Sequence, residues 1–455
     1  MNNLDQNVLD DDRIGRLLLK LSFPAFFGMF VMALYNVVDT IFIGRYVGPL
    51  GIAGLSIVFP VQMLSMGIGQ MTGMGGASQI SRLIGAGNLP RAERALGNAI
   101  TSTIGFSAII MIVGLSDTDL WLRLMGSSEA ILPYARDYMT IILIGMFFQT
   151  FAMAQHGLIR AEGNARVPMI GMIIGAALNI ILDAIFIVSL DMGIKGAALA
   201  TVIAQFISGL YFMSYYLSGN SFLKIHSRDL LIELSMMKAI LAIGVASFAR
   251  TMAGSLSVVF VNRMLVAYGG DYAVSAFGII HRIMLFAIMP GIVIGQGLQP
   301  ILGFNYGARR YDRALRAIKI AVIAATACCG VVFVVLYFFP EPFIGIFTTD
   351  NELVTVGAHA ARRVFLALYL IGFMMVGSLV FQSVGKATES FITAVAKPVL
   401  FFLPLLFILP YFWGLDGIWL AHPISDAFTS VLTFILLVPQ IRQMKEYARR
   451  ESRRE

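Results

Sequence analysis

Gly85-Ala86-Gly87-Asn88-Leu89-Pro90-Arg91-Ala92 is the most informative stretch of this chain, because its outline returns later in the sequence. From Gly85 to Gly307, 222 positions on, the pattern recurs as Gly307-Ala308-x-x-x-x-Arg313-Ala314. Two further pairs follow at nearly the same shift: Gly163-x-Ala165 with Gly385-x-Ala387, and, one residue out of step, Gly193-x-x-Gly196-x-x-Leu199-Ala200 with Gly414-x-x-Gly417-x-x-Leu420-Ala421. Because these motifs share one offset, we predict an internal repeat of two similar halves.

Both halves consist mainly of long apolar runs. Of the 455 residues, 58% are hydrophobic and 13% are charged, and the mean hydropathy of +0.82 leaves too little polar surface for a soluble globule. About 20 consecutive apolar residues suffice for a helix to cross a bilayer. The sequence therefore predicts an all-α membrane protein with twelve transmembrane helices, over residues 17–44, 53–81, 93–115, 131–154, 167–189, 193–217, 237–267, 273–302, 314–339, 358–383, 391–412 and 417–440.

The polar stretch 218–236 separates the halves and predicts a linker between two six-helix lobes. Because six is an even number, the second lobe starts on the same side of the membrane as the first, and the repeats should be parallel around a central cleft. We expect an N-lobe over 1–217, a C-lobe over 237–441 and a basic tail over 442–455.

The net charge of +7 follows the expected membrane topology. Basic residues concentrate in the loops on the side of the N-terminus, which predicts a multi-pass protein of the cell membrane with both termini in the cytoplasm. The basic tail should contact anionic lipid headgroups, and we expect no nucleic-acid partner. The polar, acidic N-terminus predicts that no cleavable signal peptide precedes the first span.

Two acids stand out inside the apolar helices, and only the first half has them. Under the 222-residue shift, Asp39 aligns with Val261 and Asp183 with Leu405. Asn179 lies one helical turn before Asp183, and Thr201 should lie at the same depth, roughly 9–12 Å below the outer surface. Buried carboxylates favour their neutral form, two of them titrate as a unit, and their oxygens also suit a small hard cation. We therefore predict a site for H⁺ or Na⁺, with no other metal site and no cofactor.

Four motifs in the first half carry a family resemblance: Pro24 fifteen positions before Asp39, Val37-Val38-Asp39-x-x-Phe42-Ile43-Gly44, Arg160-Ala161-x-Gly163-Asn164 and Asn179-x-x-x-Asp183. On these residues the chain resembles the multidrug and toxic compound extrusion (MATE) transporters, in their DinF/MepA-like branch. The resemblance extends over about residues 14–440.

The resemblance implies roles for individual residues. It implies a cation-coupling site formed by Asp39, Asn179, Asp183 and Thr201, and a first span that bends near Pro24. A fourth-span polar residue often joins this network in the family, and the nearest candidates here are Gln155 and His156. The other MATE branch has its coupling acids in spans seven, eight and ten, where this chain has none.

The second half has one acid within a span, Asp426. It should lie at nearly the same depth as His281 and Arg282, so an ion pair between them is geometrically feasible. The two interpretations are a structural pair that neutralises a buried arginine and, together with Arg250, a second polar site facing the substrate.

We therefore expect a secondary antiporter that exports lipophilic, often cationic, organic compounds in exchange for H⁺ or Na⁺, and that acts as a monomer. The alternative within transport is a flippase for lipids or lipid-linked oligosaccharides with a related two-lobe fold. No arrangement of nucleophile, base or metal ligands predicts an enzyme, and the adjacent Cys328 and Cys329 form no disulfide framework.

Overall fold

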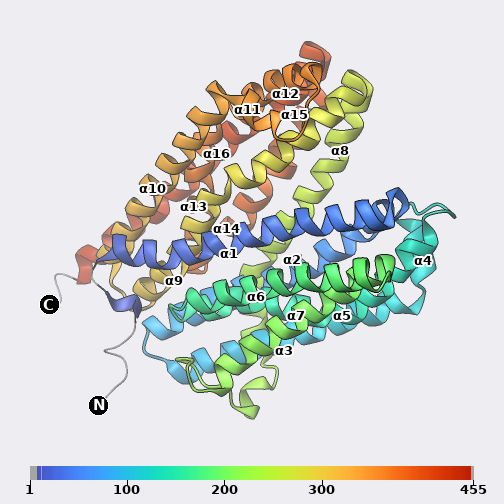
Figure 1. The fold of residues 1–455 in the computed structure, drawn as a ribbon. Helices are drawn as coiled ribbons and strands as arrows, with labels where there is room; N and C mark the ends of the chain where they lie inside the picture. Colours follow the sequence, from blue (N-terminus) through green and yellow to red (C-terminus); the bar gives the residue numbers. More distant parts are fainter. Residues whose placement is uncertain (1–7, 12, 452–455) are drawn as a thin grey trace. The chain divides into compact units, whose positions relative to one another are not determined.

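The structure is a computed structural model that describes residues 8–11 and 13–451, and every regular element in that part of the chain is a helix (Figure 1). The helices form two compact units. One unit contains Phe23–Phe248, and the other contains Ala249 onward together with the chain up to Ser22.

The unit Phe23–Phe248 is built on a bundle in which α5 packs against α2, α3 and α7. The end of α6 packs beside α7, and the short linker helix η5 lies on α3. Its elements are α1 (Ile14–Phe42, from Phe23 on), η3 (Ile43–Val47), α2 (Pro49–Gly85), α3 (Leu89–Ser116), α4 (Thr118–Leu124), α5 (Leu132–Ala161), α6 (Arg166–Asp183), η4 (Ala184–Ser189), α7 (Gly193–Leu217), η5 (Ser227–Leu230) and the first turns of α8 (Leu234–Ala287).

The second unit repeats this packing, because α13 packs against α9, α10 and α16 as α5 does against α2, α3 and α7. Its elements are η2 (Val8–Asp10), the first turns of α1, the rest of α8, α9 (Met289–Gly307), α10 (Tyr311–Phe338), α11 (Pro340–Gly345), α12 (Asn351–Val364), α13 (Leu368–Val384), α14 (Ala387–Val395), η6 (Ala396–Phe402), α15 (Leu403–Ile408) and α16 (Pro410–Glu451).

These units differ from the lobes expected from the sequence at two places. The start of α1 belongs with the later half, and the start of α8 belongs with the earlier half. Chain order alone would have put each segment with its own half. The lobe limits 1–217 and 237–441 stay a prediction.

The helices are long and apolar enough for twelve crossings. Among the described residues, ten segments qualify, and the bent pair of α12 and α13 adds an eleventh. The segment Leu234–Gly307 has 74 residues and would be about 110 Å long as one helix, against about 30 Å of hydrocarbon. Gly270, with φ of 60°, breaks its helical geometry, so this segment supplies two crossings.

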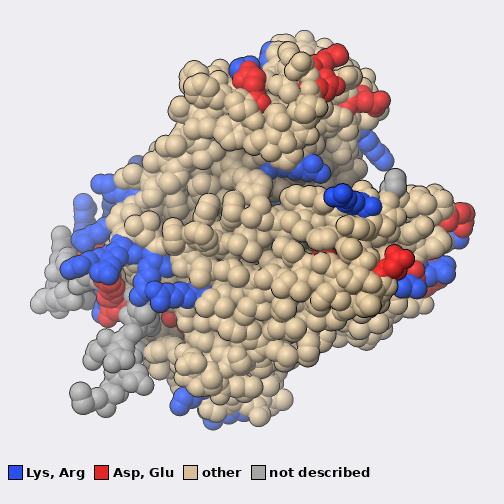
Figure 2. Space-filling view, in the orientation of Figure 1, with Lys and Arg blue, Asp and Glu red and all other residues tan. Residues whose placement is uncertain are grey.

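Charged side chains gather near the helix ends, whereas uncharged surface extends along the helices of the unit Phe23–Phe248 (Figure 2). This distribution is the one a membrane-embedded bundle requires, since a charge in the hydrocarbon is costly.

The internal repeat is also visible in the backbone. Positive φ angles occur at equivalent points of the two halves, as 90° and 60° at Gly48 and Gly270, 72° and 58° at Gly87 and Arg309, 89° and 83° at Gly163 and Gly385, and 56° and 53° at Gly193 and Gly414. Each pair is separated by 221 or 222 residues, which is the offset of the sequence motifs. The two halves therefore turn their chains at the same places.

Candidate functional site

Asp39 and Asp183 both lie where an α-helix changes into a wider π-helix. Asp39 is in the last turn of α1, just before η3, and Asp183 is the last residue of α6, directly before η4. Single π-turns inside helices are rare and are frequent at functional sites. Both acids therefore lie at local departures from regular α-helix.

The structure brings the four residues of the expected cation site into one unit. Asp39, Asn179 and Asp183 are 9%, 2% and 0% exposed. The Asn179 side-chain amide donates to Thr201 Oγ1 at 3.2 Å, which joins α6 to α7. The carboxyl groups of Asp39 and Asp183 lie within reach of a side-chain hydrogen bond, which joins α1 to α6.

Several oxygens of this cluster have no donor. Among the described residues, no atom completes a hydrogen bond to Oδ1 of Asp39, to either carboxyl oxygen of Asp183 or to Oδ1 of Asn179. Buried acceptors are normally satisfied, and leaving one without a donor costs on the order of 1–3 kcal/mol. Four unsatisfied oxygens in one place are therefore suited to receive a proton or a small cation.

The structure adds two tyrosines that sequence reasoning did not identify. The hydroxyls of Tyr35 and Tyr138 both lie close enough to Asp39 to interact with its charge. Tyr138, on α5, is 1% exposed and accepts a hydrogen bond from the Gln62 side chain at 3.0 Å. Because Tyr138 is the acceptor in that bond, its own O–H proton is not consumed by it. A tyrosine at the depth of the acids in span four was the available signal.

Gln155 and His156 are not brought to the acids. They lie 17 and 18 residues after Tyr138 on α5, which is about 25 Å along the helix. Gln155 accepts a hydrogen bond from the Tyr216 hydroxyl at 2.8 Å, and the His156 ring packs against Phe212 with centroids 5.5 Å apart. Tyr138, rather than either of these, is the α5 residue beside the acid cluster.

Pro24 is buried in α1, which remains one continuous helix through it. It lies fifteen residues before Asp39, or about 22 Å along the helix. The passage of α1 from one compact unit to the other falls between Ser22 and Phe23, directly before this proline.

In the second unit, the expected partner of Asp426 is wrong. Lys397, in the first turn of η6, forms an ion pair with Asp426, with Nζ 2.5 Å from Oδ1. His422 lies one turn before Asp426 on α16, and its ring packs 4.5 Å from Phe402. Arg282 is exposed and His281 is half-buried against Phe277. Lys397 reaches Asp426 because η6 packs directly on α16, a contact that helix depth alone could not reveal.

Arg250 occupies a separate place in this unit. Its guanidinium donates to Ser378 Oγ at 3.0 Å, and the Thr393 hydroxyl donates to the same oxygen at 3.1 Å. Arg250 is thus tied to α13 and α14.

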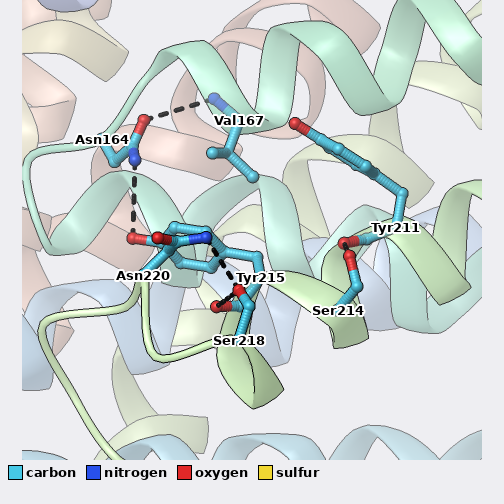
Figure 3. Close-up of a pocket in the computed structure, with 7 residues that line it drawn as sticks. All are labelled: Asn164, Val167, Tyr211, Ser214, Tyr215, Ser218 and Asn220. Atoms are coloured by element: carbon cyan, nitrogen blue, oxygen red, sulfur yellow. Dashed lines mark hydrogen bonds between the residues drawn. The ribbon is translucent and has the colours of Figure 1, made fainter.

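A polar cavity of about 400 Å³ opens at the far end of α7 (Figure 3). Tyr215 lies about 20 Å along α7 from Thr201, so this cavity is distinct from the acid cluster. In Figure 3, Asn164 links the cavity's two sides by donating to the Tyr215 hydroxyl and accepting from the Val167 backbone. The cavity is lined by Asn164, Val167, Tyr211, Ser214, Tyr215, Ser218 and Asn220.

Glu162 lies beside this cavity and is a buried acid outside the membrane-spanning helices. It accepts hydrogen bonds from the Tyr215 hydroxyl at 3.3 Å, from the Ser221 hydroxyl at 2.8 Å and from the Phe222 backbone N–H at 2.9 Å. Glu162 therefore anchors the beginning of the linker to the end of α5.

Comparisons with known proteins agree with this architecture. The MatE family model matches residues 24–185 and again residues 242–408. The multidrug export protein MepA of Staphylococcus haemolyticus (strain JCSC1435) is 26% identical over 430 residues, which cover 94% of each chain. Among solved structures, the MATE multidrug transporter DinF-BH, solved as a complex with a small organic ligand, is 40% identical, with a TM-score of 0.87, and 94% of this chain and 97% of that chain are covered.

A crystal structure of MATE in complex with MaL6 has a TM-score of 0.92 at 26% identity, with 98% of this chain and 100% of that chain covered. The two segments matched by the family model start at residues 24 and 242, close to the offset of the internal repeat. One family model therefore fits each half of the chain.

Proposed function

The chain belongs to the MatE family and is a multi-pass membrane transporter, not an enzyme, and from this premise we propose that it is a secondary antiporter. It would export lipophilic, often cationic, organic compounds in exchange for H⁺ or Na⁺. Support for the substrate class comes from two relatives, since MepA is a multidrug export protein and DinF-BH is a multidrug transporter solved with a small organic molecule bound.

The observation that supports coupling is the set of buried oxygens without donors around Asp39 and Asp183. A proton on one carboxyl would let it donate to the other, and a Na⁺ ion would accept lone pairs from the carboxylates and from Asn179 Oδ1. Either cation removes the cost of these unsatisfied acceptors. The cluster is therefore stabilised by a bound cation, as a coupling site must be.

A coupling site must also favour one conformation of the transporter over another. A ligand shifts such an equilibrium only through its different affinities for the two states. Asp39 and Asp183 come from different helices, α1 and α6, so a movement of α1 would change the distance between their carboxyl groups. Cation affinity would then differ between the states.

One cation that enters down a membrane potential of 100 mV supplies about 2.3 kcal/mol, before any concentration gradient is added. This requires the acids to face the outer side, with both termini in the cytoplasm, as the distribution of basic loops predicts. We propose that the protein lies in the cell membrane in this orientation as a monomer, with its basic tail against anionic lipids.

Export by purified protein in proteoliposomes, with a pH gradient and a Na⁺ gradient imposed separately, tests the proposal. One of the two gradients should drive uptake of a lipophilic cation such as ethidium. Asp39→Asn and Asp183→Asn keep shape and polarity but cannot exchange a proton, so each should lower gradient-driven transport by about a hundredfold or more.

The matched control is Asp137→Asn, because Asp137 is an exposed acid paired with Lys195 in the same unit. It should transport as the wild type does. Full transport by both Asp39→Asn and Asp183→Asn would contradict coupling at this site, and transport driven by neither gradient would contradict antiport itself.

A further inference from the structure

The linker between the two halves is an ordered strap that lies along one face of α3. The Asn98 side chain accepts from the Glu233 backbone N–H at 2.7 Å, and the Thr101 hydroxyl donates to the Leu230 carbonyl at 2.8 Å. A Cβ atom on Gly97 would lie 2.2 Å from the Asp229 carbonyl oxygen, so the linker backbone lies directly on the helix. Since residues 97, 98 and 101 recur at helical spacing, the strap covers one stripe of α3.

At the start of this strap, three side chains with metal-ligand chemistry converge. Glu93 comes from α3, while His226 and Asp229 come from the linker. His226 Nδ1 is 3.3 Å from Asp229 Oδ2 and 3.9 Å from Glu93 Oε2, and the three ligand atoms all lie within 4.8 Å of one another. In a tetrahedral zinc site with bonds near 2.1 Å, neighbouring ligand atoms are about 3.4 Å apart. The observed spacings need only a small inward movement to reach that value.

Asp229 supplies an independent indication of a ligand. It is 4% exposed, and its Oδ2 has no hydrogen-bond partner among the described residues, although His226 Nδ1 is close by. The other carboxyl oxygen, Oδ1, is 4.0 Å from Arg94 and 3.9 Å from Arg228. The two arginines thus hold the carboxylate from one side and leave Oδ2 directed at His226. Outer groups commonly orient a metal-ligating carboxylate in this way.

We propose that Glu93, His226 and Asp229 form a binding site for a divalent transition-metal ion such as Zn²⁺. One imidazole nitrogen with two carboxylates favours Zn²⁺, Co²⁺ or Ni²⁺ over Mg²⁺ and Ca²⁺, which prefer oxygen ligands alone. The two carboxylates balance the charge of the ion. The His226 side chain is 46% exposed and lies outside the membrane-spanning helices, so the ion can enter from the aqueous phase.

A bound ion would fasten the strap to α3 at its first contact. The Lys224 backbone N–H already donates to Glu93 Oε1 at 3.1 Å, so the ion would add to an existing attachment. Lys224 and Arg228 are exposed cleavage sites for trypsin on either side of His226. Metal binding should therefore protect the linker from trypsin. This inference does not depend on the transport proposal, because neither metal binding nor proteolysis involves the acid cluster.

The test uses the full-length protein, purified in detergent, freed of its affinity tag and treated with EDTA before removal of the chelator. Isothermal titration with Zn²⁺ should show one site per chain in the wild type. His226→Ala should weaken it by about a hundredfold, since the loss of a ligand should reach the upper range seen for outer-shell changes. Co²⁺ should give visible d–d absorption that disappears in the same variant.

The matched control is His359→Ala, because His359 is an equally exposed histidine beside an acid, with Nε2 3.0 Å from Asp416. It should bind Zn²⁺ as the wild type does. Glu93→Gln provides a second variant that keeps the length of the side chain, and it should also lose binding. No Zn²⁺ binding by the wild type, or equal binding by His226→Ala, would overturn the proposal and leave the cluster as an ion-pair network only.

Discussion

Glu162 illustrates how a single buried acid can make stability depend on pH. Burial raises the pKa of Glu162 from 4.5 to about 7, although hydrogen bonds from Ser221, Phe222, Leu223 and Tyr215 oppose this shift. In the unfolded chain the carboxyl ionises near 4.5, whereas in the folded protein it stays protonated until about 7. The folded state therefore binds more protons in this window, and the free energy of unfolding falls as pH rises through it.

We expect the wild type to lose stability between pH 5 and pH 8, by up to about 3 kcal/mol from this group. Glu162→Gln is neutral at every pH and keeps an acceptor for the Phe222 N–H, so its melting temperature should vary less over the same range. Scanning fluorimetry of the detergent-solubilised protein measures both. The exposed acid Glu129, changed to Gln, is the control and should keep the wild-type slope. An equal slope for Glu162→Gln and wild type would contradict the assignment.

At the same scale, the sequence identified some site residues and missed others for a definite reason. Asp39, Asn179, Asp183 and Thr201 could be predicted because ionisable and amide groups are rare inside apolar spans and helical rise gives their depth. Tyr138 and Lys397 were missed, and Gln155 and His156 were expected elsewhere, because such contacts depend on how neighbouring helices are rotated. Depth along a helix is readable in one sequence, but rotation against a partner is not.

Among the elements, α2 and α5 approach most closely through glycine. A Cβ atom on Gly73 would lie 2.7 Å from the Ala154 carbonyl oxygen, and one on Gly157 would lie 2.8 Å from the Gly73 carbonyl oxygen. Membrane helices pack in this way because small residues let their backbones approach. Since α2 and α5 carry Gln62 and Tyr138, their separation would also disturb the acid cluster.

Gly73→Ala should therefore destabilise the protein by about 1–3 kcal/mol, because the added methyl group meets backbone rather than a flexible side chain. The control is Gly105→Ala in α3, where no atom lies within 4 Å of the new Cβ atom. Melting temperature and the monodisperse fraction after detergent extraction compare the two variants. If Gly73→Ala were as stable as Gly105→Ala, the close packing of α2 on α5 would be contradicted.

The first helix is the second element whose sequence predicts movement. Proline removes one backbone donor and weakens the helix locally, so Pro24 is the expected bending point of α1. Its place directly after the passage of α1 between units supports this interpretation. A bend at Pro24 would move the wall formed by α1 without removing any residue of the acid cluster.

Pro24→Ala should leave substrate binding measurable and slow export several-fold, because the conformational step is hindered while the binding groups remain. Fluorescence anisotropy measures binding of a lipophilic dye, and vesicle export measures turnover. Export at the wild-type rate would show that the proline is only a packing feature.

For the whole molecule, the internal repeat made most of the fold predictable. Motifs at one offset and apolar runs of sufficient length predicted the spans, including the separation of 237–267 from 273–302, which the structure realises at Gly270. The assignment of the first turns of α1 and α8 to opposite units was not predictable, because it rests on contacts between residues far apart in the chain.

The parallel arrangement of the repeats makes a topological prediction for the whole chain. With six crossings per half, Asn88 between α2 and α3 and Arg309 between α9 and α10 should lie on the same, cytoplasmic face, and Thr118 at the start of α4 on the opposite face. Single cysteines at these positions, in a background with Cys328 and Cys329 replaced, can be labelled with a membrane-impermeant maleimide. Residue 118 should react in intact cells, and residues 88 and 309 only in inverted vesicles. Labelling of 88 and 309 from opposite sides would contradict the parallel repeat, and with it the requirement that both halves begin on the same side of the membrane.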